Sequence, residues 1–303
     1  MSCSDKRKAR AAGAARAWVR RGAAACTVLL ASTLAQAAGI SASDTPSCYA
    51  ANKLDIPAPT PEREVFVLLD QTTPLDATLQ RSVAENLDRL LQPGTAYSLA
   101  TFSSFGQGRY LEVLSAGTLE RPLPDAARNS IGVKVLRNFD ACLQGQQRYV
   151  RTQAAQTLQQ GLAGISTAYV KSDVMASIRE ISSRVQQSRA ADRILFVVSD
   201  MLENSGVSSF YAQRNMRQID AATELKKAEA NGMLASLAGA RVFVLGAGLV
   251  QDPKAKNGVA RDSGVYRDPR AMAALKDFWA QYFQRSQATL EQFGMPALLV
   301  PVN

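Results

Sequence analysis

Uninterrupted runs of apolar residues recur along the chain and predict strands that are buried on both faces. The first run is Val65-Phe66-Val67-Leu68-Leu69, and similar runs occupy residues 194–198 and 242–245. Central strands of a parallel sheet have this composition because helices cover both of their faces. Shorter or more mixed runs predict further strands at residues 97–102, 110–114 and 298–300.

Between these runs, apolar residues recur at helical spacing. After Pro74, which suits the first turn of a helix, leucine or valine occupies every fourth position from Leu75 to Leu91, and Pro93-Gly94 then ends the pattern. Residues 251–268 are predicted to form a polar loop, whereas residues 117–145 show no clear period. Helices are predicted in the same way at residues 75–91, 146–162, 172–185, 212–237 and 270–293.

This alternation of buried strands and amphipathic helices predicts the fold class. It is typical of an α/β fold with a doubly wound, mostly parallel central sheet and helices on both faces. No composition change interrupts the alternation, so we expect one domain over residues 64–303.

The N-terminus has the three parts of a secretory signal. Residues 2–21 hold seven lysines and arginines, residues 22–34 are mostly apolar, and Ala35-Gln36-Ala37 fits a signal-peptidase site. We therefore predict a signal peptide at residues 1–37 and a periplasmic or secreted mature protein. The alternative is an uncleaved N-terminal anchor, which would be the protein's only membrane contact. Residues 38–63 form a proline-rich leader in which no regular element is expected.

Charge and composition exclude several functions. The whole chain carries a net charge of +9, of which residues 1–37 contribute +6, so the mature part holds only +3. Such a weak charge indicates no nucleic-acid partner. The chain contains no histidine, which excludes Ser-His-Asp and Cys-His catalytic sites and most zinc sites.

Two cysteines remain after the signal. Cys3 and Cys26 precede the predicted cleavage site, whereas Cys48 and Cys142 follow it. Two cysteines in an exported domain are expected to form a disulfide. The alternative is a pair of buried free thiols.

Acidic and hydroxyl side chains follow the predicted buried strands. Asp70 comes directly after residues 65–69, and Asp200 comes two residues after 194–198. Ligands of such sheets bind beyond the carboxyl ends of the strands, so both acids are expected on one rim. Carboxylates and hydroxyls suit Mg²⁺ or a similar cation, although Thr73 and Ser172 also suit helix caps. The nearby hydroxyls are Thr72, Thr73, Ser172 and Ser199.

These segments resemble a von Willebrand factor A-type (vWA) domain over about residues 62–303. That family carries a metal-ion-dependent adhesion site. Asp70 and Thr72 match the acid and first hydroxyl of its Asp-x-Ser-x-Ser motif, while Ser172 and Asp200 match its second and third motifs. Pro74 stands where the motif has its second hydroxyl, so the motif is degenerate. The site then either binds a cation with one ligand fewer or has lost the ion while the fold is kept. The resemblance implies Mg²⁺ or Mn²⁺ at Asp70, Thr72, Ser172 and Asp200.

Two functions follow from these residues. The vWA resemblance implies a non-enzymatic binding or scaffold module of the cell envelope with protein partners. The alternative is an aspartate-nucleophile phosphatase or phosphotransferase of the haloacid-dehalogenase-like type, with Asp70 as nucleophile, Lys171 stabilising charge and Asp200 binding Mg²⁺. That alternative expects a flap directly after Asp70, whereas the sequence predicts a long helix there.

Overall fold

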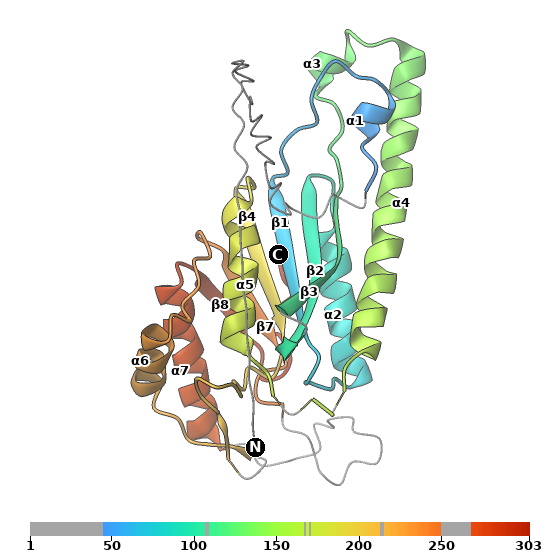
Figure 1. The fold of residues 1–303 in the computed structure, drawn as a ribbon. Coiled ribbons are helices and arrows are strands. Elements are labelled where there is room, and N and C mark those ends of the chain that lie inside the picture. Colours follow the sequence, from blue (N-terminus) through green and yellow to red (C-terminus); the bar gives the residue numbers. More distant parts are fainter. Residues whose placement is uncertain (1–44, 107–108, 167, 170, 213–214, 250–267) are drawn as a thin grey trace, which may run out of the picture. The chain divides into compact units, whose positions relative to one another are not determined.

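The computed structural model describes residues 45–106, 109–166, 168–169, 171–212, 215–249 and 268–303, which belong to one compact unit, Ile40–Asn303. A six-stranded sheet forms its centre, in the order β3-β2-β1-β4-β7-β8 (Figure 1). Neighbouring strands are parallel except for β3, which pairs antiparallel with β2. The strands are β1 (Arg63–Asp70), β2 (Thr95–Gly106), β3 (Arg109–Thr118), β4 (Asp192–Val198), β7 (Arg241–Leu245) and β8 (Thr289–Phe293).

Helices cover both faces of this sheet. Alternate residues of β1, such as Val65 and Val67, pack in one cluster with α2 (Ala77–Leu90) and α4 (Val133–Ala163). Phe66 and Leu68 point the other way and pack with α5 (Val174–Gln187), α6 (Ala221–Ala230) and α7 (Pro269–Arg285). This arrangement confirms the predicted α/β class with a mostly parallel, doubly wound sheet (Figure 1).

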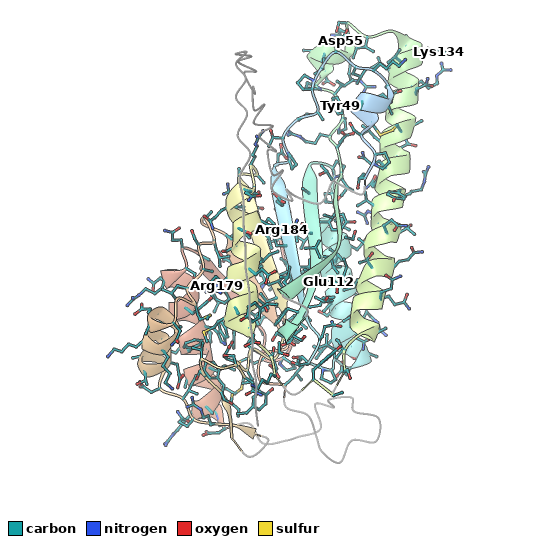
Figure 2. All side chains as sticks on the ribbon, in the orientation of Figure 1. Tyr49, Asp55, Glu112, Lys134, Arg179 and Arg184 are labelled. Carbon is teal, nitrogen blue, oxygen red and sulfur yellow. A yellow bond between two sulfur atoms is a disulfide. The ribbon has the colours of Figure 1, made fainter. Side chains whose placement is uncertain are left out.

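Helix α4 extends beyond the amino ends of the strands. Its 31 residues span about 46 Å, whereas the eight residues of β1 span about 26 Å. The overhanging part packs with α1 (Cys48–Ala51) and lies near α3 (Asp125–Arg128) (Figure 1). Tyr49 and Lys134 mark this end of the molecule in Figure 2. A separate apolar cluster forms there around Cys48, Tyr49, Leu123 and Phe139.

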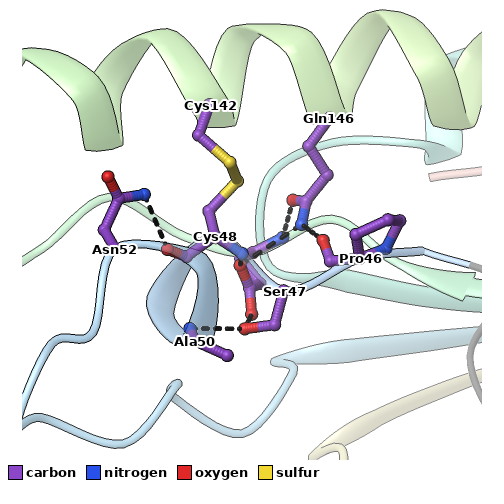
Figure 3. Close-up of a disulfide and its surroundings, with 8 residues drawn as sticks. Pro46, Ser47, Cys48, Ala50, Asn52, Cys142 and Gln146 are labelled. Atoms are coloured by element: carbon purple, nitrogen blue, oxygen red, sulfur yellow. Dashed lines mark hydrogen bonds between the residues drawn. A yellow bond between two sulfur atoms is a disulfide. The ribbon is translucent and has the colours of Figure 1, made fainter.

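A disulfide between Cys48 and Cys142 holds α1 against α4 (Figure 3). Their Cα atoms lie 5.7 Å apart. Glu120 fixes the same segment, because its carboxylate accepts hydrogen bonds from the Ser47 hydroxyl at 2.6 Å and the Cys48 backbone N–H at 2.7 Å. The predicted cysteine pair therefore ties the leader to the domain, and α1 is a regular element where none was expected.

The predicted helix at residues 212–237 is wrong over much of its length. A two-stranded hairpin, β5 (Tyr211–Ala212) and β6 (Asn215–Met216), occupies its start, and α6 covers only Ala221–Ala230. Asn231 and Gly232 end α6, with Gly232 at a φ of +64°. The turn is closed locally, because Gly232 N–H donates to the Glu229 carbonyl and Met233 N–H donates to the Ala228 carbonyl, so Asn231-Gly232 was a helix-stop signal in the sequence. The hairpin depends on tertiary contacts, since Phe210 N–H donates to the Glu203 carbonyl.

The C-terminal elements also differ from the prediction. Helix α7 stops at Arg285, and Gln287, at a φ of +59°, turns the chain into the edge strand β8. Residues 298–300 form no strand, because the Gln292 side chain holds the backbone of Leu299 and Val300 and leaves Leu299 95% exposed. Helix α4 also begins 13 residues before the predicted 146–162.

Some predictions fall on residues that the structure does not describe. The signal peptide at residues 1–37 lies outside the described part of the chain, as does almost all of the polar loop at 251–268. Among the described residues, no helix combines the length and apolar character that crossing a bilayer requires.

Candidate functional site

The carboxyl ends of β1 and β4 bring the predicted site residues to one rim of the sheet. The two strands are parallel neighbours, with Leu69 beside Val198, so Asp70 and the Ser199-Asp200 pair leave the sheet together. The loop before α5 adds Ser172, which lies 102 residues after Asp70 in the sequence. Three distant segments thus meet at this edge, as the carboxyl-end rule for parallel sheets requires.

Asp70 is the centre of this rim and accepts four hydrogen bonds. Its Oδ1 accepts from the Thr72 backbone N–H at 2.9 Å and the Thr72 hydroxyl at 2.7 Å. Its Oδ2 accepts from the Ser199 hydroxyl at 2.7 Å and the Ser172 hydroxyl at 3.2 Å. The side chain is 1% exposed, and burial raises the pKa of its carboxyl while these hydrogen bonds oppose that rise.

Asp200 lies beside Asp70 and has a different environment. Its Oδ1 accepts from the Leu202 backbone N–H at 2.9 Å, and its Oδ2 accepts from the Tyr211 hydroxyl at 2.5 Å. Burial raises the pKa of Asp200 to about 8, and the neighbouring charge of Asp70 adds to the rise. The two carboxylates therefore repel each other, so a proton or a cation at Asp200 is electrostatically favoured.

The hydroxyls at the rim do not cap helices. Thr73 Oγ1 accepts from the Asp200 backbone N–H at 3.1 Å, and the cap of α2 comes instead from Asp76, which accepts from Leu79 N–H at 2.8 Å. Ser172 donates to Asp70, and the N-cap position of α5 is held by Asp173 instead. These hydroxyls connect the segments of the rim to one another.

The first turn of α5 is capped by an acid from another segment. Glu203, 1% exposed, accepts from the Met175 backbone N–H at 2.9 Å, and the N-cap residue Asp173 makes no side-chain cap bond. Burial raises the pKa of Glu203 to about 8. Glu203 therefore links the segment that follows Asp200 to the helix that follows Ser172.

The backbone around Asp200 is sharply turned. Met201 adopts a φ of +59°, which is unfavourable for a residue with a side chain. The Trp279 indole donates to the Met201 carbonyl at 2.8 Å and holds this turn. On the other side, Gly246 has a φ of +104°, and a Cβ there would lie 3.0 Å from the Ser199 carbonyl oxygen. Gly248 N–H then donates to the Asp200 carbonyl at 2.8 Å, so the Gly246-Ala-Gly248 segment is a turn that supports the rim.

The chemistry of these oxygens fits a hard cation with one ligand fewer than the vWA motif offers. Thr72 and Ser172 direct their protons at Asp70, and hydroxyl oxygens are among the ligands that a hard cation accepts. Pro74 supplies no side-chain oxygen. The described ranges contain no group of three acidic, cysteine or histidine side chains that could hold a metal ion. Hydroxyl groups would therefore have to complete the ligands of the cation. Metal ligation by Asp70, Thr72, Ser172 and Asp200 remains a prediction.

Sequence reasoning missed two parts of the rim. The sequence gives no signal for Tyr211, since the segment that follows it has the pattern of a helix. Ser199 was noted as a nearby hydroxyl, but its bond to Asp70 could not be assigned. Its position directly before Asp200 and after a buried strand was the available signal.

Comparisons with known proteins give fold likeness only. No protein-family model and no curated protein matches the sequence. An aerotolerance-related membrane protein from Bacteroides fragilis NCTC 9343 is 13% identical over 77% of this chain and 92% of its own, with a TM-score of 0.36. The pilus adhesin SpaC from Lactobacillus rhamnosus GG is 10% identical over 77% and 28%, with a TM-score of 0.37. The PilB minor pilin from Streptococcus sanguinis is 10% identical over 79% and 58%, with a TM-score of 0.40. Likenesses this distant assign no family.

Proposed function

We propose that this chain is an exported binding module of the cell envelope, whose rim around Asp70 and Asp200 holds a protein partner with the help of Mg²⁺ or Mn²⁺. One observation carries the proposal. Two buried carboxylates lie at the carboxyl ends of adjacent parallel strands, surrounded by hydroxyls from three segments. Asp70, Thr72, Ser172 and Asp200 would hold the cation.

Electrostatics supports a cation at this place. Burial raises the pKa of Asp200 and the charge of Asp70 adds to the rise, so the two acids disfavour each other's ionised form. A divalent cation lowers that repulsion, and hard oxygen ligands are the ones that Mg²⁺ and Mn²⁺ prefer. The ion would also leave a coordination position for an acidic or carbonyl group of a partner.

The segment that follows Asp70 favours binding over phosphoryl transfer. An aspartate-nucleophile phosphatase of the haloacid-dehalogenase-like type is expected to carry a flap directly after its aspartate. In this chain helix α2 begins at Ala77, seven residues after Asp70. Lys171 is exposed, and no hydrogen bond among the described residues joins it to Asp70.

Export is part of the same proposal and rests on two features. The first is the basic-apolar-small pattern of residues 1–37. The second is the disulfide between Cys48 and Cys142, because disulfides persist in oxidising compartments such as the periplasm.

Thermal unfolding with and without cation tests the rim. Saturation at 100 times the dissociation constant would stabilise the protein by about 2.7 kcal/mol, or roughly 5–10 °C in Tm for a domain of this size. Asp200→Asn keeps the shape of the side chain and should lose this shift, whereas the control Asp277→Asn, on the exposed face of α7, should keep it. Identical Tm values with and without Mg²⁺ and Mn²⁺ would refute metal-assisted binding.

A further inference from the structure

The hydroxyl of Tyr211 occupies the side of Asp200 that faces the hairpin β5–β6. It donates to Asp200 Oδ2 at 2.5 Å. The other carboxylate oxygen, Oδ1, is held by the backbone N–H of Leu202, which is part of the same turn and cannot leave without unfolding it. In the described part of the chain, Tyr211 is therefore the displaceable side-chain donor on Asp200.

The base of the hairpin is firmly placed. Phe210 is fully buried and packs edge-on against Phe278 of α7, with ring centroids 5.0 Å apart. Arg217 lies over the Phe210 ring at 6.0 Å, and its Nε donates to the Ser209 carbonyl at 2.6 Å. The tyrosine that follows Phe210 is thereby aimed at Asp200 without the help of a ligand.

The hairpin is also joined to the loop that carries Ser172. Asn204 forms backbone bridges to both Ser172 and Ser209, and its N–H donates to the Ser172 carbonyl at 2.9 Å. Because Ser172 donates to Asp70, the hairpin contacts both halves of the rim. Tyr211 is therefore connected to the rim both through Asp200 and through this bridge.

We infer that Tyr211 is a built-in competitor for the cation, and that its hydroxyl must leave Asp200 before an ion is fully ligated there. This inference rests on the proposed cation site. A phenol O–H and a cation both stabilise a buried carboxylate, because each places positive charge beside a lone pair of Oδ2. The two cannot take the same direction at once, so the intramolecular bond lowers the apparent affinity for the ion.

Tyr211→Phe tests this competition, because it removes the hydroxyl and keeps the ring. Loss of one hydrogen bond changes an equilibrium by about 3- to 10-fold, so Tyr211→Phe should bind Mn²⁺ about 3- to 10-fold more tightly than wild type. The control is Tyr97→Phe. Tyr97 is 2% exposed and its hydroxyl shares a 2.8 Å hydrogen bond with Ser115 Oγ on β3. This control should bind as wild type does.

The measurement is calorimetric titration of the mature chain with Mn²⁺ alone, after treatment with a chelator. Tighter binding by Tyr211→Phe supports the competitor. Equal affinities overturn it and leave the cation site in place. Weaker binding by Tyr211→Phe also overturns it, because the phenol oxygen would then be a ligand. If neither protein binds Mn²⁺ while both unfold cooperatively, the cation site fails and the competitor fails with it.

Discussion

Replacing Glu203 by glutamine should make the protein less sensitive to pH. Glu203 is 1% exposed and accepts a hydrogen bond from Met175 N–H in the first turn of α5. Burial raises the pKa of its carboxyl from 4.5 to about 8, with a hydrogen bond from Ser205 opposing the rise. The native protein therefore keeps a proton on Glu203 at pH values where the unfolded chain has lost it.

The size of the effect follows from proton linkage. A raised native pKa contributes stability that is complete below pH 4.5 and is lost as the pH rises to about 8. Within this window one extra proton on the native state lowers the free energy of unfolding by up to about 1.4 kcal/mol per pH unit. Asp200, whose pKa is also raised to about 8, contributes a similar slope, so the two together give up to about 2.7 kcal/mol per pH unit. Glutamine keeps an oxygen that accepts from Met175 N–H, but it does not titrate, so it removes the contribution of Glu203 to this slope.

Urea unfolding between about pH 5.5 and 7.5, with a chelator present, measures these slopes, because ordinary carboxyl groups are ionised in both states there. We expect wild-type stability to fall with pH and Glu203→Gln to show about half the slope. The control Glu85→Gln changes an exposed acid on α2 and should retain the wild-type slope. A wild-type stability that is constant or rises across this window would refute the reasoning, as would an unchanged slope in Glu203→Gln.

Three further predictions concern the disulfide, the backbone and the N-terminus. Cys142→Ser removes a disulfide between positions 94 residues apart and should lower the free energy of unfolding in urea by up to about 4–5 kcal/mol. Reductant should lower the stability of wild type by the same amount. If neither change lowers the stability, the disulfide does not stabilise the fold. Ala238 has a φ of +49°, so Ala238→Gly should raise the free energy of unfolding by about 0.5–1 kcal/mol. The control Ala84→Gly, inside α2, should lower it by about 1 kcal/mol. A lower stability in Ala238→Gly would show that this backbone conformation carries no strain. Mass spectrometry of protein from the native host should find Ala38 at the N-terminus, and an intact Met1 in soluble cytoplasmic protein would argue against export.

The layered fold follows from local sequence pattern. Residues 65–69, 194–198 and 242–245 are apolar at every position, and all three lie in central strands with helices on both faces. The every-fourth-residue spacing from Leu75 to Leu91 likewise marks α2. Such patterns can be read without tertiary information because a strand or helix that is buried must present apolar side chains at a fixed period.

Element ends were decided by tertiary contacts. The sequence from 270 to 293 reads as one helix, yet residues 289–293 form the edge strand because β7 offers them a parallel partner. Similarly, α1 exists in a proline-rich segment because Ser47 caps it, Glu120 binds it and Cys142 is bonded to it. Local propensity for helix or loop is weak compared with such pairings.

The candidate site divides in the same way. Asp70 and Asp200 could be placed on one rim from the sequence alone, because parallel strands end at the same edge. Only the folded chain shows that Ser199 donates to Asp70, that Glu203 caps α5 and that Tyr211 reaches Asp200. These contacts join residues whose relation depends on the path of the loops, and loop paths have no period from which side-chain partners can be predicted.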